Sequence, residues 1–273
     1  MHLIGLVGAS GFIGKHISMH TNEATNFISL QHRGSIKDIK LSLSTFNNLI
    51  KDSQASIIYL AENNDISVAE KQGNDYIKDN TSRLKIFLDN TYAKIIYASS
   101  VDIYGDKSEK PHLPEENLVP LNFYAKSKFE CEKLVLAAGG TVARISNVYG
   151  QGMSSSNIIS EILAQITDSN IEFIKIRDGS PKRDFINVYD VASCLIKMAK
   201  KPKLGIYNVA TGKARSMKEI ASHILSIFNL PDCKILERNP SVSNSSIFLD
   251  ISSTVNEFKW SPKISLQEGL ESL

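Results

Sequence analysis

The sequence predicts an α/β protein with a doubly wound parallel sheet and a smaller C-terminal α/β domain. Short apolar runs alternate with longer stretches of helical periodicity over the first 150 residues, and the first run ends in a glycine-rich turn. Strands that alternate with helices build a parallel sheet through right-handed crossovers. Beyond Gly150 the segments are shorter and more polar, so we place a domain boundary there.

The composition is that of an ordinary globular protein. Of the 273 residues, 42% are hydrophobic and 22% are charged, and the net charge of +2 gives no reason to expect nucleic acid or an anionic membrane as a partner. Cys131, Cys194 and Cys233 lie far apart, which argues against a disulfide framework and against a zinc site. With no signal peptide and no apolar run of about 20 residues, we expect a cytoplasmic protein without a bound metal.

Periodicity and turn residues define the expected elements. In the first 150 residues we expect strands at 2–7, 26–30, 56–61, 94–100 and 142–145, and helices at 12–21, 68–88 and 124–138. Further on we expect strands at 171–175 and 206–209, a helix ending at Thr167, and helices at 187–200, 216–228 and 265–270.

The glycine-rich turn Gly8-Ala9-Ser10-Gly11-Phe12-Ile13-Gly14 separates the first strand from the first helix. In a Rossmann-type sheet, glycines at this point let the backbone approach a pyrophosphate that binds at the helix N-terminus. The spacing is Gly-x-x-Gly-x-x-Gly, whereas the usual fingerprint is Gly-x-Gly-x-x-Gly. The turn therefore predicts a dinucleotide cofactor, and the alternative is a tight turn with no ligand.

The end of the second strand bears on which dinucleotide binds. An acidic residue here accepts hydrogen bonds from the adenosine ribose of NAD. The chain instead offers Gln31, His32 and Arg33, with no carboxylate before Asp38. A guanidinium suits a 2′-phosphate, so the sequence favours NADP(H) over NAD(H), unless Arg33 is only a solvated loop residue.

Two further groups of side chains suggest proton chemistry. Tyr124 and Lys128 are four residues apart at the start of a helix and can share one face. A cation beside a phenol favours the phenolate, as a tyrosine that exchanges protons requires. Ser99 and Ser100 end the fourth strand, at the edge where ligands of parallel sheets bind. Taken alone, the tyrosine and lysine could be a half-buried residue beside a solvated one, and the serines could simply cap a turn.

With these residues aligned, the sequence resembles the extended short-chain dehydrogenase/reductase family, in its nucleotide-sugar epimerase/dehydratase branch. The resemblance covers nearly the whole chain and rests on ordered blocks. Beside the glycine turn they are Ser99–Gly105, Tyr124–Lys128, Arg144–Gly150, Arg183–Val188, Asn208 with Gly212, and Trp260–Ile264.

The resemblance implies roles for individual residues. Tyr124 would be the general acid/base, Lys128 would lower its pKa and hold the nicotinamide ribose, and Ser100 would donate to the same sugar oxygen. The implied cofactor contacts are Gly8, Gly11, Phe12, Ile13, Gly14, Arg33, Leu60, Ala61, Asn80, Tyr124 and Lys128. The implied substrate contacts are Ser99, Ser100, Asp102, Asn147 and Arg183. The alternative for Arg183 is a surface ion pair with Asp184.

The resemblance also implies an assembly and a division of the chain. We expect a homodimer that pairs through helices, among them the Tyr124 helix. Residues 1–150 would form the NAD(P)-binding domain, with 187–212 packing back on it, and residues 151–186 and 213–273 would form the substrate-binding domain.

Two departures from the family concern the adenine side of the cofactor. Glu62 stands where the family has a second alanine after the third strand, and the acidic motif between the second and third strands is absent from Lys40–Ser44. We therefore expect the contacts to adenine and its ribose to differ from those of the family.

Three reactions share this scaffold. We expect reduction of a 4-keto nucleotide sugar, because it needs only Tyr124, Lys128, Ser100 and a loosely held NADPH. The alternative is a 4-epimerase with tightly bound NAD. A 4,6-dehydratase ranks third, because the acid pair that follows the catalytic hydroxyl in dehydratases is Val101-Asp102 here. A function of a different class would be that of a non-catalytic, cofactor-binding sensor on the same fold. The presence of Tyr124, Lys128 and Ser100 disfavours this alternative.

Overall fold

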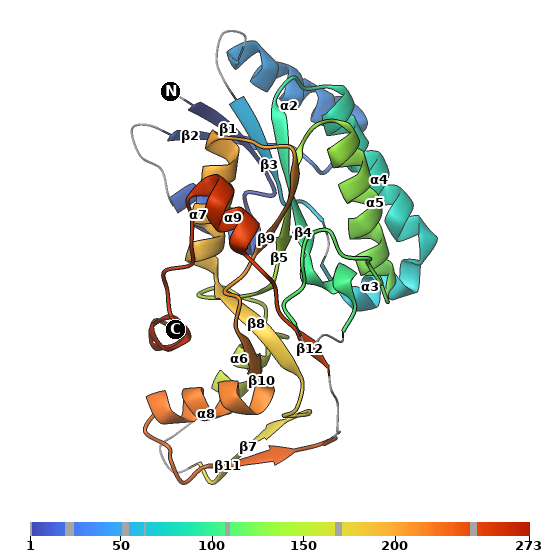
Figure 1. Cartoon of the computed structure of the whole chain (residues 1–273). Helices are drawn as coiled ribbons and strands as arrows, with labels where there is room; N and C mark the ends of the chain where they lie inside the picture. The colour runs from blue at the N-terminus through green and yellow to red at the C-terminus, as the bar shows by residue number, and fades with distance from the viewer. Residues whose placement is uncertain are drawn as a thin grey trace.

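A parallel sheet forms one half of the molecule. A computed structural model describes residues 2–19, 25–50, 55–62, 64–106, 110–166, 171–240 and 245–273, and every element below lies in these ranges. Within them the sheet has six strands in the order β2-β1-β3-β4-β5-β9, and each neighbouring pair is parallel (Figure 1). The strands are β1 (His2–Val7), β2 (Thr25–Leu30), β3 (Ala55–Tyr59), β4 (Lys94–Ser100), β5 (Thr141–Ile145) and β9 (Gly205–Val209).

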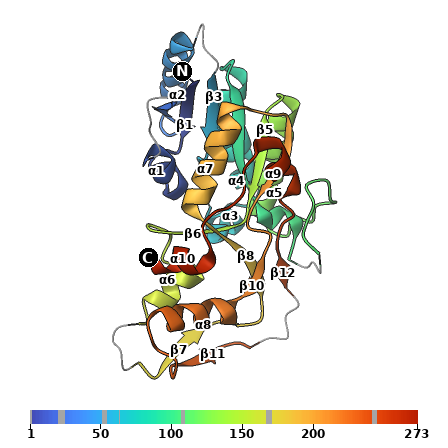
Figure 2. The ribbon, with the colours of Figure 1, turned by 60° about the vertical axis from the view of Figure 1, so that its left-hand side comes forward.

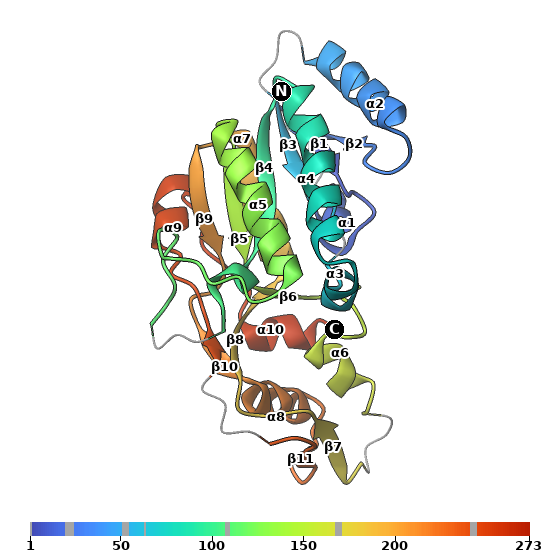
Figure 3. The ribbon, with the colours of Figure 1, turned by 90° about the vertical axis from the view of Figure 1, so that its right-hand side faces the viewer.

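Helices cover both faces of this sheet, so the predicted doubly wound Rossmann-type fold is confirmed. Helices α1 (Phe12–Met19) and α7 (Val188–Lys200) pack on one face, where Ile17 and Leu195 join the core (Figure 2). The other face is covered by α2 (Ile36–Leu49), α4 (Asn74–Asp89) and α5 (Phe123–Ala137), with α4 and α5 side by side (Figure 3). Strands buried on both faces read as continuous apolar runs, as β3 and β4 do here.

The strand order places the glycine turn at the point where ligands of such sheets bind. Strand β1 lies between β2 and β3, so the chain reverses its direction of travel across the sheet at this position. The crevice outside the carboxyl ends of the strands at a reversal is the usual ligand site. The turn at Gly8–Gly14 follows β1 directly and opens into it.

A smaller α/β part lies beyond the carboxyl ends of the sheet (Figure 1). Its strands form one group of β6 (Asn147–Tyr149), β8 (Lys182–Asn187), β10 (Ala214–Ser216) and β12 (Ser246–Ile247), and a pair of β7 (Phe173–Ile176) and β11 (Lys234–Glu237). Its helices are α6 (Ile158–Leu163), α8 (Met217–Ile227) and α10 (Leu266–Glu271). These elements share a separate apolar core that includes Ile162, Ile174 and Ile224.

The last part of the chain returns to the main sheet. Helix α9 (Ser252–Phe258) packs against β9, and Phe258 and Trp260 belong to the core beneath α7. The Trp260 ring nitrogen donates to the Ser193 hydroxyl at 2.9 Å. The backbone N–H groups of Lys263 and Ile264 donate to the Asp190 carboxylate at 3.0 and 2.9 Å. The segment thereby fastens α10 to α7.

Two expectations about helices need correction. The helix expected at 68–88 is two helices, α3 (Ile66–Gln72) and α4, separated by Gly73. Gly73 has a φ of +58°, which ends the regular helix and which glycine adopts at little cost. Helix α2 was not predicted, although Ser35 and Asp38 form a capping box at its start and Ile39, Leu43 and Phe46 supply a buried stripe.

The other element boundaries agree within a few residues. The expected helix ends at Thr21 and Thr167 lie outside the described residues. Within the described ranges no helix is both long enough and apolar enough to cross a bilayer.

A buried ion pair fastens α5 to the sheet. Arg144 on β5 donates from Nε and Nη2 to the two Glu132 carboxylate oxygens at 3.0 and 2.7 Å. Its Nη1 donates to the Tyr104 hydroxyl and to the Pro114 carbonyl, so the guanidinium is well satisfied although its side chain is only 2% exposed. The two-point geometry fixes both the position and the orientation of α5.

Replacing Glu132 with alanine should lower the free energy of unfolding by about 3–5 kcal/mol, because it leaves the Arg144 charge buried and unpaired. Urea unfolding followed by circular dichroism would measure the loss. The matched control is Glu130→Ala on the same helix, where Glu130 pairs with Lys133 at the surface and the loss should stay below about 1 kcal/mol. Equal losses in the two variants would contradict the assignment of a structural role to the buried pair.

Candidate active site

Tyr124 owes its position to the start of α5. Asn122 caps this helix, and its side-chain oxygen accepts from the Ala125 backbone N–H at 2.7 Å. The Phe123 N–H donates to Glu70 of α3, also at 2.7 Å. These two bonds fix the first turn, so the Tyr124 ring is held toward the sheet with only 8% of its surface exposed.

Ser100 faces Tyr124 from the end of β4. Its hydroxyl caps the short helix η1 (Val101–Tyr104) by accepting from the Asp102 N–H at 3.2 Å, and its proximity acts to lower the pKa of the Tyr124 phenol. The same hydroxyl acts to lower the pKa of the Asp102 carboxyl, but burial has the larger effect and raises it. Ser100, Asp102 and Tyr124 therefore form one connected group at the carboxyl end of β4.

Lys128 lies one turn further along α5 and is buried. Its Nζ donates to the Ala98 carbonyl at 2.8 Å and lies 2.9 Å from Oε2 of Glu62. The ammonium also lies 5.0 Å from the centre of the Tyr97 ring and 5.8 Å from that of Tyr124. Burial is the largest single effect on the pKa of Lys128 and lowers it, but the Glu62 carboxylate, together with Tyr124 and Cys131, raises the pKa by more, so that the pKa is raised overall. Lys128 is therefore a permanent cation at neutral pH.

The pKa of Tyr124 is raised, although Lys128 was expected to lower it. Burial is the largest cause of the rise. The Lys128 ammonium and the Ser100 hydroxyl act in the opposite direction, whereas the charges of Asp102 and Glu62 add to the rise. Lys128 does act to lower the pKa of Tyr124, as expected, but burial and the two carboxylates raise this pKa by more. Tyr124 therefore carries its proton at neutral pH.

The glycine turn has the shape that a dinucleotide requires. Gly8 has a φ of +90°, and the Gly11 N–H donates to the Gly8 carbonyl at 3.0 Å. A Cβ on Gly14 would lie 2.2 Å from the same carbonyl oxygen, so the close turn depends on glycine. A Cβ on Gly8 would touch the backbone of Leu60 and Ala61 at 3.2 Å. The turn, the end of β3 and the N-terminus of α1, where Phe12 and Ile13 lie, thus form a cradle that fits a pyrophosphate.

The carboxyl end of β2 carries positive charge. Arg33 is exposed in the loop after this strand. Arg83 of α4 reaches the same loop, where its Nη1 donates to the His32 carbonyl at 3.3 Å while its Nε binds Asp79. Burial and both guanidiniums lower the pKa of His32. Sequence reasoning missed Arg83, because it enters the loop from a helix more than 50 residues away.

Asn80 and Ser99 lie near the group around Tyr124 but point elsewhere. Asn80 is buried on α4 and donates to the Ser127 hydroxyl of α5 at 3.1 Å. Ser99 is buried within β4. Side chains alternate along a strand, so Ser99 faces the side of the sheet opposite to Ser100.

Asn147 and Arg183 belong to the smaller part of the molecule, on β6 and β8. Asn147 donates to the Asp184 carbonyl at 3.3 Å. Arg183 donates to the Lys182 carbonyl at 2.8 Å. Burial lowers the pKa of its guanidinium, and the charges of Asp102 and Asp106 act in the opposite direction. The alternative of an ion pair with Asp184 is wrong. The Asp184 carboxylate is buried and accepts from the backbone of Thr211 and Gly212 and from the Thr211 hydroxyl.

The structure therefore brings most of the predicted residues to one edge of the sheet. At the centre are Ser100, Tyr124 and Lys128. The glycine turn lies against the end of β3, on the far side of Glu62. The charge of Asp102 acts on Arg183 and so relates this centre to the smaller part of the molecule. Arg33 lies apart, at the end of β2. From the sequence, Glu62 was noted only as a departure from the family that would change the adenine contacts. In the structure Glu62 instead forms an ion pair with Lys128.

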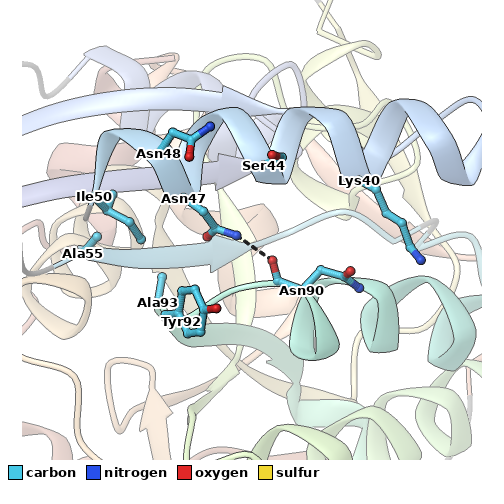
Figure 4. A pocket seen from close by; sticks show the side chains of 9 residues that line it. All are labelled: Lys40, Ser44, Asn47, Asn48, Ile50, Ala55, Asn90, Tyr92 and Ala93. Carbon is cyan, nitrogen blue, oxygen red and sulfur yellow. Dashed lines mark hydrogen bonds between the residues drawn. The ribbon is translucent and has the colours of Figure 1, made fainter.

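A separate hollow lies at the opposite edge of the sheet. It has a volume of about 650 Å³ and lies between α2 and the end of α4, at the amino ends of β3 and β4 (Figure 4). Asn47 bridges its walls by donating to the Asn90 carbonyl at 2.8 Å. This hollow therefore lies away from the group around Tyr124.

Among the described residues, no three His, Cys, Asp or Glu side chains gather closely enough to hold a metal ion.

Comparison with known proteins agrees with this geometry. The family described as "NAD dependent epimerase/dehydratase family" matches residues 4–210. A curated relative, GDP-6-deoxy-D-mannose reductase of Pseudomonas aeruginosa, is 26% identical over 81% of this chain and 79% of its own length. The chain spans 45% of the length of another relative, a trifunctional dehydratase, epimerase and reductase of UDP-sugars from Arabidopsis thaliana, with 22% identity over 97% of this chain.

Two solved structures share the fold along the whole chain. RMD from Pseudomonas aeruginosa complexed with NADPH superposes with a TM-score of 0.86 and 22% identity, covering 100% of this chain and 97% of that one. UDP-glucose 4-epimerase from Thermotoga maritima with UDP-glucose superposes with a TM-score of 0.85 and 20% identity, with the same coverage. At these identities the similarity establishes the fold.

Proposed function

Because the chain belongs to the NAD dependent epimerase/dehydratase family, we propose that it reduces the 4-keto group of a nucleotide-activated sugar with NAD(P)H. The observation that carries this proposal is the buried, protonated Tyr124, which lies close to the Ser100 hydroxyl and beside the Lys128 cation. A carbonyl that accepts a hydride must gain a proton on its oxygen, and a protonated phenol is the group that supplies it.

In the proposed reaction, Tyr124 and Ser100 both donate to the sugar carbonyl oxygen and so hold it in place. When bound, the reduced nicotinamide supplies the hydride to the carbonyl carbon. Tyr124 gives its proton to the oxygen as negative charge develops there, and Lys128 stabilises the phenolate that remains. Water then returns a proton to Tyr124. The glycine turn would hold the pyrophosphate of the cofactor and Arg33 its 2′-phosphate, with Phe12, Ile13, Leu60 and Ala61 around the dinucleotide. Asn80, whose amide is directed to Ser127, would act only through α5.

Binding of the nucleotide part falls to the smaller half of the molecule in this proposal. Arg183 can hold two phosphate oxygens at once, and Asn147 lies on the neighbouring strand. We propose that residues 1–150 with 187–212 form the cofactor half and that residues 151–186 and 213–273 form the substrate half. The segment 252–264 would then act as a strap between them, since it packs on α7.

The alternative function is 4-epimerisation with retained NAD, which would use the same three residues. The similarity to a UDP-glucose 4-epimerase structure keeps this reading open. It requires Tyr124 to take a proton first, and a raised pKa works against that step. Dehydration ranks third, because Asp102 is bonded to Ser100 and is preceded by Val101.

Replacing Tyr124 with phenylalanine should lower the rate of keto-sugar reduction by about 100-fold to 10,000-fold, because the proton donor is lost. The assay supplies the purified protein with NADPH or NADH and a panel of 4-keto nucleotide sugars and follows the absorbance of the reduced cofactor. The matched control is Tyr207→Phe on β9, whose ring packs against Phe258 away from the site. The control should keep full activity.

Two outcomes would overturn these assignments. Full turnover by Tyr124→Phe would remove the acid/base role. If no keto sugar consumed reduced cofactor and the protein instead isomerised a nucleotide sugar without added cofactor, the epimerase reading would replace the reductase.

We also propose that NADPH is preferred over NADH, on the basis of the Arg33 and Arg83 guanidiniums at the end of β2. Arg33→Ala should weaken NADPH binding by about tenfold, because a charged hydrogen bond to the 2′-phosphate is lost. Binding of NADH to the same variant is the internal control and should not change. Equal changes for both cofactors, measured by fluorescence titration, would contradict a 2′-phosphate contact.

We further propose a cytoplasmic homodimer that pairs through the layer formed by α4 and α5. These helices lie side by side on one face of the sheet, and the family resemblance supports pairing there. Light scattering should give twice the mass of the chain. The mass of a single chain at micromolar concentration would argue against the dimer.

A further inference from the structure

Glu62 is a buried carboxylate to which the proposed reaction assigns no role. It lies three residues after the end of β3, and its side chain is only 2% exposed. Oε2 lies 2.9 Å from the Lys128 Nζ, and Oε1 accepts from the Tyr97 hydroxyl at 2.5 Å. A carboxylate is not buried at such a position without strong partners. Here both of its oxygens have one.

The same contacts restrict Lys128. An ammonium has three N–H donors. One of them donates to the Ala98 carbonyl of β4, and the Glu62 carboxylate, three residues after the end of β3, lies at ion-pair distance. The ammonium is therefore drawn toward the sheet, and it keeps donors for the cofactor ribose or the Tyr124 oxygen.

The other titratable groups near Lys128 do not replace Glu62 as its partner. Burial raises the pKa values of Tyr59 on β3, Tyr97 on β4, Tyr76 on α4 and Cys131 on α5, so these four groups are neutral at neutral pH. The charge of Asp102 acts on Tyr124 and interacts with Arg183. Glu62 is thus the carboxylate that balances the Lys128 charge.

We propose that Glu62 is a positioning residue that holds Lys128 as a charge-balanced pair and so sets Tyr124 to deliver a proton to a sugar carbonyl instead of taking one from a sugar hydroxyl. This inference rests on the proposed keto-sugar reduction. The direction follows from charge, because a phenolate forming beside an unbalanced ammonium gains more stabilisation than one beside an ion pair. Tyr124 transfers its proton to the carbonyl oxygen while the carbon receives the hydride of NAD(P)H, which leaves NAD(P)⁺ and a phenolate.

The test is the ionisation of Tyr124 in the protein without cofactor or substrate. The absorbance of tyrosinate is followed against pH for the wild type and for Glu62→Gln, and the same titrations with Tyr124→Phe added are subtracted. Glu62→Gln keeps the shape and an acceptor for Tyr97 but removes the charge. The midpoint for Tyr124 should fall by about one pH unit, because Lys128 is no longer balanced.

The activity of the holoenzyme gives a second reading. Reduction requires protonated Tyr124, so the rate is present below the pKa of Tyr124 and is lost as the pH rises through it. In Glu62→Gln this loss should occur about one pH unit earlier. Glu130→Gln is the matched control, because it removes a carboxylate charge from the same helix at the surface, where Glu130 pairs with Lys133. Its Tyr124 midpoint should equal that of the wild type.

The outcomes separate the inference from the proposed function. An unchanged or higher Tyr124 midpoint in Glu62→Gln would overturn the inference, and so would a loss of NADPH affinity without any shift, which would make Glu62 a cofactor contact. If Glu62→Gln does not fold, Glu62→Asp withdraws the carboxylate by one methylene and should give a smaller shift in the same direction. A wild type that reduces no keto sugar would refute the proposed function, even if the midpoint shifts as expected.

Discussion

The burial of the Lys128 ammonium against the sheet is the interaction on which the site depends. Removing a charge from water costs several kcal/mol unless partners replace the lost hydration. Glu62 and the Ala98 carbonyl provide those partners at 2.9 and 2.8 Å, and both belong to the ends of parallel strands. Lys128 therefore cannot shift without leaving a charge unpaired, and the helix that carries it is fixed with it. Tyr124 lies one turn earlier on the same face of this helix, so its position is fixed as well.

A second buried ion pair makes this constraint stronger. Glu132 lies one turn beyond Lys128 on α5 and pairs with Arg144 of β5. The two pairs have opposite polarity, since the helix supplies the cation in one and the anion in the other. Together they connect α5 to β3, β4 and β5 at two levels, which resists both rotation and sliding of the helix. The proposed reaction needs such rigidity, because small displacements of an acid/base group from the reacting atoms cost rate.

The sequence allowed the sheet, the glycine turn and the pairing of Tyr124 with Lys128 to be predicted, because each depends on local spacing. The break at Gly73 was missed because a glycine within a helical pattern does not reveal its φ angle. Helix α2 was missed, although the Ser35 and Asp38 capping box and the buried stripe of Ile39, Leu43 and Phe46 both mark it in the sequence. The partner of Lys128 could not be predicted, because Glu62 meets it only after β3 and α5 pack. The raised pKa of Tyr124 has the same origin, as it is set mainly by burial.

The connection between the two halves of the molecule follows from two buried carboxylates. Asp184 binds the loop after β9, and Asp190 binds the segment before α10, so the smaller part is attached to the main sheet at two points. Arg183, adjacent to Asp184, is thereby held at a fixed position relative to Tyr124. Before substrate binds, Asp102 balances the Arg183 charge across the gap between the halves. In the proposed reaction, a diphosphate on Arg183 would supply the negative charge that Asp102 now supplies. The interaction between Arg183 and Asp102 therefore couples the proposed nucleotide site to the group around Ser100 and Tyr124.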